Sequence, residues 1–464
     1  MASHRPSDRP SDASTAATAP AADRAAGARP AAGWPPEVWP VWQRVLFRVG
    51  FVYLVLQMAP WTWFDAVPGV AAVTGYAGRV DAWAVEGANA RAFHVRPTLV
   101  PPNGSGDTSY AWAQLWLYLL AALAAGVVWS LLDRRRRAYP QLLYWLRTLV
   151  RYWLAAAALS YGVIKLFALQ MPFPTLSQLA TPLGDFLPMR LSWMFVGYSA
   201  PYQVFSGAVE AAAGLLLLRR STVTLGLMVA AGAFLNVVLI NLAYDVPVKL
   251  FASHLLLGCV VLLALDARRL WTFLVLNRPA PGTAAYEPHY ARPWHRPAAR
   301  AAKLATVLLI GVLPAWESWT RARSMAVAPR GPFRPGVYDV RRFARNGDTL
   351  PPLLADTMRW RDVIFDNAGQ GSVNTADPVF WQRYRRGYFR YAADTARRTL
   401  AVWKTSTRLD SVPLFTARYA VPDSDTVRLW TRVRGDSVYA ELVRTRRHFQ
   451  LAERQFHWVS EYNR

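Results

Sequence analysis

Two side chains of opposite charge, Lys165 and Glu210, stand inside long apolar stretches of this 464-residue sequence. An ionisable group at membrane depth costs a few kcal/mol or more, so it usually marks a functional site or is paired. Lysine is also scarce, because only four of the 53 basic residues are lysines. An amine and a carboxyl together can contact a ligand and relay a proton, or they can form a structural pair that fixes helix register. We take Lys165 and Glu210 as candidate catalytic residues and keep the structural pair as the alternative.

Four more polar side chains lie in or beside the same stretches, and they are candidate ligand-binding residues: Tyr161, Asn236, Asn241 and His254. Tyr161 precedes Lys165 by one helical turn. Each also has an ordinary structural interpretation. Buried asparagines more often form hydrogen bonds between helices than contact ligands, and a lone histidine on an apolar helix is more often a satisfied core residue.

The sequence predicts no metal site and no evident bound cofactor. No second histidine or acidic residue stands at ligand spacing from His254. The single cysteine, Cys259, excludes an intramolecular disulfide, a cysteine-based zinc site and a Cys-x-x-Cys redox motif. Motifs for flavin, haem or nicotinamide binding are also missing from the sequence.

Seven apolar stretches must position these side chains, and each approaches the ~20 residues that a membrane span needs. They are residues 45–63, 110–132, 152–171, 202–218, 223–244, 250–265 and 304–319. The fourth, sixth and seventh are short, so a buried helix of a soluble protein is their alternative. At 1.5 Å per residue, Lys165 is expected ~9 Å and Glu210 ~12 Å below the outer surface. The polar groups should therefore meet in the outer half of the bilayer.

The basic residues orient these segments. Arginine clusters fall on a single side if all seven segments cross: Arg44 and Arg48, residues 134–137, 219–220 and 268–269, and those between 292 and 303. The loops 173–200 and 243–249 are nearly free of them. This positive-inside pattern predicts a multi-pass protein of the cell (inner) membrane, with a cytoplasmic N-terminus and an extracytoplasmic C-terminal domain.

Two connecting segments carry local signals. Asp245 precedes the sixth apolar stretch and is a candidate N-cap for its helix. In the loop 61–109, residues 80–86 are amphipathic, which is compatible with a helix on the membrane surface or with an ordinary loop.

The composition divides the chain into three parts. Residues 1–36 are rich in Ala, Pro, Ser, Asp and Arg, which predicts a disordered tail. Residues 37–320 form the predicted transmembrane helical domain. Residues 321–464 are polar and alternate with the period of a strand, and the sequences Asn346-Gly347-Asp348 and Arg434-Gly435-Asp436 indicate tight turns. We predict an antiparallel β sandwich or barrel there, of the scale of a lipocalin.

The positive-inside arginines account for much of the +24 net charge. No helix or aromatic-basic module in residues 321–464 indicates nucleic-acid binding. The predicted partners are therefore the lipid bilayer and a membrane quinone or lipid ligand, with no nucleic acid.

At these positions the sequence resembles the DoxX-like family of bacterial integral membrane proteins. Gly162-Val163-Ile164-Lys165 resembles the Gly-x-x-Lys of the first core helix in that family. Glu210 and Gly214, followed by the apolar residues 215–218 and by Arg219-Arg220-Ser221-Thr222, resemble the next helix. The resemblance covers about residues 145–270 and implies a four-helix core.

Residues 195–199 and 244–249 also resemble a subset of uncharacterised proteins that carry extra N-terminal helices and a C-terminal β domain. The family name derives from a subunit of thiosulfate:quinone oxidoreductase, so the resemblance implies a link to quinone chemistry in the membrane. The long loop after Lys165 and both flanking regions depart from the small members of the family.

The resulting fold prediction is a polytopic α-helical membrane protein with about seven transmembrane helices, a four-helix DoxX-like core and a C-terminal β domain. The functional hypothesis is that a polar pocket binds or reduces a membrane quinone, with Lys165 contacting a carbonyl and Glu210 relaying a proton. The alternative is a non-enzymatic envelope assembly or binding module that acts through its β domain. Whether the protein is an enzyme stays open at this point. A secondary transporter is less well supported, since no inverted repeat with broken helices is evident.

Overall fold

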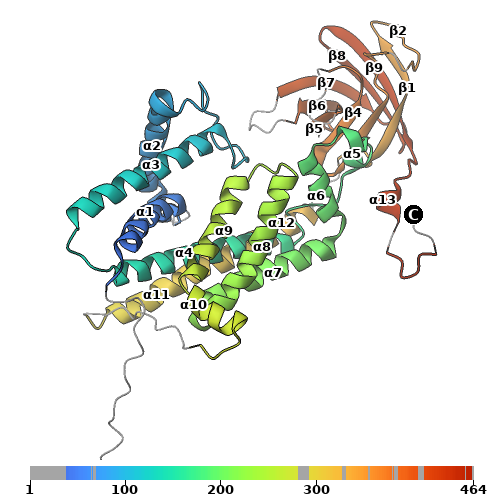
Figure 1. Cartoon of the computed structure of the whole chain (residues 1–464). Coiled ribbons are helices and arrows are strands. Elements are labelled where there is room, and N and C mark those ends of the chain that lie inside the picture. The colour runs from blue at the N-terminus through green and yellow to red at the C-terminus, as the bar shows by residue number, and fades with distance from the viewer. Residues whose placement is uncertain are drawn as a thin grey trace, which may run out of the picture.

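The computed structural model describes residues 38–63, 65, 69–280, 292–326, 331–353, 356–378, 380, 385–405, 412–454 and 456–461. The predicted tail, residues 1–36, lies outside the described residues. The described chain forms a helical bundle and a β-barrel that lies at one end of it (Figure 1).

The helical part follows the apolar segments of the sequence. Its helices are α1 Val41–Met58, α2 Val70–Ala88, α3 Ser109–Leu132, α4 Pro140–Leu166, α5 Leu176–Leu179, α6 Pro188–Tyr198, α7 Ala200–Leu218, α8 Val223–Ala243, α9 Lys249–Ala264, α10 Ala267–Leu270, α11 His295–Val307 and α12 Leu313–Ala326. A short helix, α13 Gln450–Glu453, follows the barrel.

Among the described residues, six helices are long and apolar enough to cross a membrane. A seventh crossing results if α9 and the segment Ala267–Val275 count as one span bent by 73°. The predicted segments therefore correspond to helices, with shifted ends. The third segment differs most, because α4 begins at Pro140 and ends at Leu166 instead of running to residue 171.

The stretch 80–86 belongs to the 19-residue helix α2, which packs against α3. Asp81 on α2 accepts hydrogen bonds from Tyr110 Oη, Gln114 Nε2 and Tyr118 Oη on α3. These three bonds satisfy a half-buried carboxylate and fix α2 against its neighbour. The stretch is thus a helix held by polar contacts to another helix.

Helices α4 and α7 form the tightest contact in the bundle, and glycine makes it close. A Cβ atom placed on Gly207 would lie 2.6 Å from the Gly162 carbonyl oxygen and 2.7 Å from Lys165 Cβ. A Cβ atom on Gly162 would lie 2.5 Å from the backbone nitrogen of Ala211. Small residues allow two helix backbones to approach in this way inside a membrane bundle.

The C-terminal part is a closed eight-stranded antiparallel barrel. Its strands are β1 Gly336–Arg345, β3 Asp362–Phe365, β4 Gln370–Asn374, β5 Gly387–Asp394, β6 Thr399–Lys404, β7 Val412–Ala420, β8 Thr426–Val433 and β9 Asp436–Thr445. The two-residue strand β2, Asp348–Thr349, extends the edge of β1. Strand β1 pairs with both β3 and β9, and this double pairing closes the barrel.

The alternation in the sequence predicted the two faces of the strands. Val427, Leu429 and Thr431 on β8 are buried in the interior, whereas Trp430 lies outside and is exposed. Both predicted turns also form. Gly347 and Gly435 take positive φ angles of 95° and 91°, the region that a tight hairpin turn requires.

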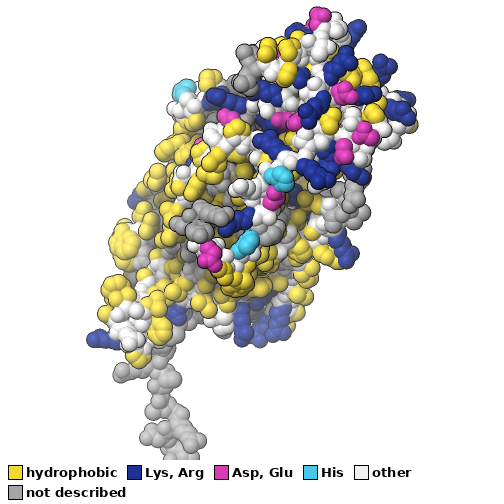
Figure 2. All heavy atoms as spheres, turned by 90° about the vertical axis from the view of Figure 1, so that its right-hand side faces the viewer, with side chains coloured by type: hydrophobic (Ala, Val, Ile, Leu, Met, Phe, Trp, Pro, Cys, Tyr) yellow, Lys and Arg dark blue, Asp and Glu magenta, His cyan; other side chains and the backbone are white. Residues whose placement is uncertain are grey.

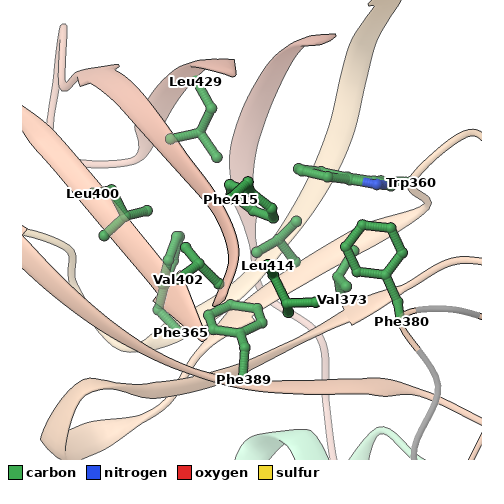
Figure 3. A pocket seen from close by; sticks show the side chains of 11 residues that line it. Trp360, Phe365, Val373, Phe380, Phe389, Leu400, Val402, Leu414, Phe415 and Leu429 are labelled. Carbon is green, nitrogen blue, oxygen red and sulfur yellow. The ribbon is translucent and has the colours of Figure 1, made fainter. Parts of the chain in front are cut away.

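Aromatic side chains fill the barrel interior (Figure 3). The space that remains among them is about 10 Å³, roughly one water molecule. The rings that line it are Trp360, Phe365, Phe380, Phe389 and Phe415. The barrel therefore has lipocalin scale, and the space among these described rings is too small for a ligand.

The glycine contact between α4 and α7 predicts the effect of a single added side chain. Gly207→Val would push the new side chain into the backbone of Gly162, and overpacking of this kind costs about 1–3 kcal/mol. We expect a clearly lower unfolding temperature for the purified variant. Gly232→Val is the matched control, because a Cβ atom at Gly232 meets nothing within 4 Å. Equal unfolding temperatures for both variants would contradict the close contact.

Candidate functional site

Lys165 and Glu210 form an ion pair between α4 and α7. Lys165 Nζ lies 2.5 Å from Glu210 Oε1, and the two residues are only 6% and 4% exposed. The α7 stripe of Gln203, Gly207 and Glu210 is buried. Because the glycine contact brings the two backbones together, the amine and the carboxyl reach each other across it. The structure thus brings the two candidate catalytic residues into direct contact.

The position of Lys165 along its helix differs from the sequence prediction. The expected depth of ~9 Å assumed a helix running at 1.5 Å per residue to residue 171. Helix α4 ends at Leu166, and Ala168 takes a left-handed φ of 51° that turns the chain away. Lys165 therefore lies in the last turn, and the folded segment that follows α4 provides part of its burial.

A cavity of about 240 Å³ opens beside the ion pair. Its walls come from α4, α7, α8 and α9 and from the connection between α4 and α7. Most of the lining is apolar or aromatic, including Trp193, Tyr202, Phe205, Phe234 and Phe251. The polar lining residues are Tyr161, Lys165, Gln170, Ser206, Glu210, Asn236 and Asn241. A mostly apolar pocket with a few convergent polar groups is typical of a site for a small amphiphilic molecule.

Three of the four candidate ligand-binding residues line this cavity: Tyr161, Asn236 and Asn241. Asn236 is exposed on α8, whereas Asn241 is buried and donates a hydrogen bond from Nδ2 to the Val248 carbonyl, at 3.3 Å. Asn241 therefore also has the structural role that its residue type suggested.

His254 lies outside the cavity lining and faces α1. Its Nε2 is 2.6 Å from Tyr53 Oη and 3.0 Å from Gln57 Nε2, and its Nδ1 is 2.6 Å from the Leu250 carbonyl oxygen. Because Nδ1 contacts an acceptor and Nε2 contacts an amide donor, these contacts fit a neutral ring protonated on Nδ1. His254 is a satisfied residue that joins α9 to α1.

The connection between α4 and α7 forms the outer wall of the cavity, and it is held in place. Met171 N donates to Gln203 Oε1 at 2.9 Å, and Gln203 Nε2 donates to the Met171 carbonyl at 2.8 Å. A Cβ atom on Gly197 would lie 2.5 Å from the Pro172 carbonyl oxygen, so α6 also packs closely on this connection. Gln170, Met171, Trp193 and Val196 line the cavity from this segment.

Sequence reasoning missed these wall residues. Their loop, which is nearly free of Arg and Lys, indicated only the side of the membrane. Gln203 lies on the buried stripe of α7, but its partner Met171 is 32 residues away in sequence. No local pattern could have paired them.

The barrel holds the same connection from the other side. Ser372 Oγ on β4 donates to Ser177 Oγ on α5 at 2.7 Å, and Arg386 Nε donates to Ser372 Oγ at 2.6 Å. Arg386 also forms a buried ion pair with Asp362 on β3. Thr181 Oγ1 lies 2.9 Å from Tyr388 Oη on β5. The barrel and the outer wall of the cavity are therefore joined by a buried polar network.

Asp366 belongs to this junction. Its Oδ1 accepts a hydrogen bond from Ser177 N, and the residue is 7% exposed. Burial raises the pKa of Asp366 above its ordinary value, although the hydrogen bonds from Ser177 oppose the shift. Removing a carboxylate from water disfavours its charged form, and here that effect is the larger one.

Asp245 does not cap α9, which corrects the sequence prediction. Asp245 takes a left-handed φ of 50° and its side chain reaches Lys249 Nζ at 2.7 Å. Asp107 caps the helix instead, since its carboxylate accepts from Lys249 N at 2.8 Å and Leu250 N at 2.9 Å. The cap comes from a distant loop, where side-chain spacing in the sequence could not reveal it.

The ion pair leaves hydrogen-bonding capacity beside the cavity. Glu210 Oε2 is buried and accepts no hydrogen bond from any described residue. An ammonium group carries three N–H donors, and one of those on Lys165 is directed to Glu210. The pair can therefore donate to a ligand oxygen through the amine and exchange a proton through the second carboxyl oxygen.

A double-substitution cycle separates pairing from other roles. Lys165→Met alone leaves a buried carboxyl without its partner, a loss of about 3–5 kcal/mol in buried pairs. We expect Lys165→Met and Glu210→Leu each to lower the unfolding temperature strongly, and the double variant to recover much of it. Lys303→Met, at an exposed lysine, is the control and should change little. Additive losses in the double variant would contradict a direct interaction.

The raised pKa of Asp366 predicts a pH-dependent stability. The folded protein binds the Asp366 proton more tightly than the unfolded chain, so stability rises as pH falls through the folded-state pKa. Asp366→Asn keeps an acceptor for Ser177 N and cannot ionise. We expect this variant to unfold at a higher temperature than wild type at neutral pH, with the difference vanishing below about pH 4. Asp348→Asn, on exposed β2, is the surface control. A pH-independent difference for Asp366→Asn would argue against the assignment.

Comparison with known proteins adds a limited similarity. No family model matches the chain, and no solved structure matches it. The chain is similar to the uncharacterized protein YwoB of Bacillus subtilis (strain 168), with 37% identity over 91 residues. The match covers 20% of this chain and 57% of that relative. The chain thus spans little more than half the length of the relative, and the similarity leaves its activity to be inferred from the site.

Proposed function

We propose that the helical part spans the cell (inner) membrane, with the N-terminus in the cytoplasm and the barrel outside. The long apolar helices support a membrane location. Figure 2 shows a broad band of hydrophobic side chains between a basic cluster at the lower end and the charged barrel surface at the upper end. This distribution suits a bilayer with its cytoplasmic face at the basic end.

Within this bundle we propose a DoxX-like core made of α4, α7, α8 and α9. Each of these helices packs against two others in a ring, and the cavity lies among them. The resemblance to the family rests on the Gly-x-x-Lys of α4 and the glutamate of α7. The lysine and the glutamate of these two motifs form the ion pair. The helices α1–α3 and the barrel would then be additions to this core.

The proposed function of the core is to bind a membrane quinone beside Lys165 and Glu210. The observation that carries this proposal is the position of the ion pair at the wall of a 240 Å³ apolar cavity instead of in a filled helix contact. An apolar cavity of about 150 Å³ is enough for a benzene ring. The observed cavity therefore suits a substituted ring with polar substituents.

The two charged residues would have separate roles toward a quinone. Lys165 Nζ would donate a hydrogen bond to a ring carbonyl, which draws electron density toward that oxygen. Glu210, through its second carboxyl oxygen, would accept a hydrogen bond from a ring hydroxyl or exchange a proton with it. Tyr161 and Asn236, which line the same cavity, would help to orient the ring.

The test is organic extraction and mass spectrometry of protein purified in mild detergent from its host membrane. We expect a quinone in near-stoichiometric amount in wild type, and at least a tenfold lower amount in the double variant Lys165→Met/Glu210→Leu. His254→Gln, which alters a polar residue outside the cavity, is the matched control and should retain the quinone. Wild-type protein that is folded but carries no quinone, and binds none when one is added, would reject the proposal.

The alternative function is a non-enzymatic envelope assembly or binding module. Its support is the buried network between Ser177, Ser372 and Arg386, which joins the barrel to the connection after α4. On this alternative the ion pair only fixes α4 against α7, and the barrel binds a lipid or protein partner on its outside. A folded double variant that keeps its biological function would favour it.

A further inference from the structure

Side chains of α7 and α8 line one side of the cavity. We propose that the cavity opens to lipid between these two helices, that the ligand enters there from the outer half of the bilayer, and that an apolar chain of the ligand stays in the opening. The ligand class is then an amphiphile, with a polar head at the ion pair and a chain that reaches lipid. This inference rests on the proposed function. It adds the route by which the ligand enters and the apolar chain that the ligand carries.

Helices α7 and α8 pack closely at the end where they are joined. A Cβ atom on Gly226 would lie 2.9 Å from Leu216 Cβ and 3.0 Å from Leu217 N. At this end the two backbones are therefore as close as glycine allows. The connection between them, residues 219–222, carries two exposed arginines and belongs to the basic end of the bundle.

In the other half, the facing edges of the two helices line the cavity. Tyr202, Ser206 and Val209 recur at helical spacing along one edge of α7. Ala233 and Ile240 lie along the facing edge of α8 and line the same space. The cavity therefore lies between the facing edges of the two helices in this half, and the proposed gap is there.

This gap reaches the outer surface of the bundle. Tyr202 is 49% and Phe205 is 64% exposed, yet both also line the cavity. Asn236 on α8 is likewise an exposed lining residue. Its neighbours Leu235 and Leu239 are exposed on the apolar outside of α8. The gap is thus framed by side chains that face lipid in the proposed orientation, with one amide at its rim.

Contacts cross three other sides of the cavity. On the water side, Gln203 holds the connection after α4 through its two bonds to Met171. Between α4 and α7, Gly162 and Gly207 bring the backbones together. Between α4 and α9, Tyr161 and Phe251 also line the cavity and are 37% and 38% exposed, and their rings stand against each other across that side, with centroids 6.2 Å apart. The α7–α8 gap is the route that crosses none of these contacts.

Spin-label accessibility tests this route without any ligand. Ser206→Cys and Ala233→Cys, one on each edge of the gap, are labelled with a nitroxide in full-length protein in lipid nanodiscs. Collision rates are measured with oxygen, which concentrates in lipid, and with a nickel chelate, which stays in water. Leu235→Cys is the lipid-facing control and Asp348→Cys on β2 is the water-facing control. The native Cys259 is fully buried, and unlabelled parent protein gives the background.

We expect the labels at positions 206 and 233 to collide with oxygen within about twofold of the rate at position 235, while the nickel chelate reaches them at least fivefold less than position 348. Frequent collisions with the chelate would show that the cavity opens to water, and low rates with both reagents would show that the gap is closed. Either result overturns the proposed route. Absence of a quinone in the extraction experiment would overturn the proposed ligand and leave this measurement unaffected.

Discussion

The contact between Lys165 and Glu210 is the constraint on which the rest of the helical part depends. An amine or a carboxyl alone in an apolar bundle is strongly unfavourable, and together they become acceptable when each satisfies the other. Lys165 Nζ lies 2.5 Å from Glu210 Oε1, so the two charges are paired directly. This requirement sets how close α4 and α7 must be, and the glycines at 162 and 207 provide that closeness. The pair and the glycines therefore belong to the same contact between α4 and α7.

The same pair determines where a cavity can persist. A well-packed apolar helix bundle leaves few voids, but side chains that must reach each other at the end of α4 cannot also fill the space toward α8. The connection after α4 then covers that space and the barrel holds the connection. The polar network of Ser177, Ser372 and Arg386 is remote from the ion pair, yet it fixes the wall that shields the pair from water. The barrel thus contributes to the site through the position of this wall.

The barrel interior is packed largely with aromatic side chains. In strands that alternate apolar and polar residues, every second side chain points into the barrel. Here many of these inward side chains are aromatic. Eight strands give a barrel that side chains can fill completely. Rings such as Trp360 and Phe365 fill it to within about 10 Å³. Its stability comes from that packing, and its outer arginines are available for contacts with headgroups or a partner.

The sequence alone determined the long apolar helices, the β character of the C-terminal part and the identity of the unusual side chains, because apolar periodicity and turn residues report local burial and backbone geometry. It therefore predicted the apolar segments, the hairpin turns at Gly347 and Gly435 and the candidates Lys165 and Glu210. Only the tertiary structure decided that these two touch, that His254 faces Tyr53 and that Asp107 caps α9. It also decided how the barrel closes through β1 and β9. Each of these depends on residues far apart in the chain, and local patterns say that a face is buried without saying what it faces.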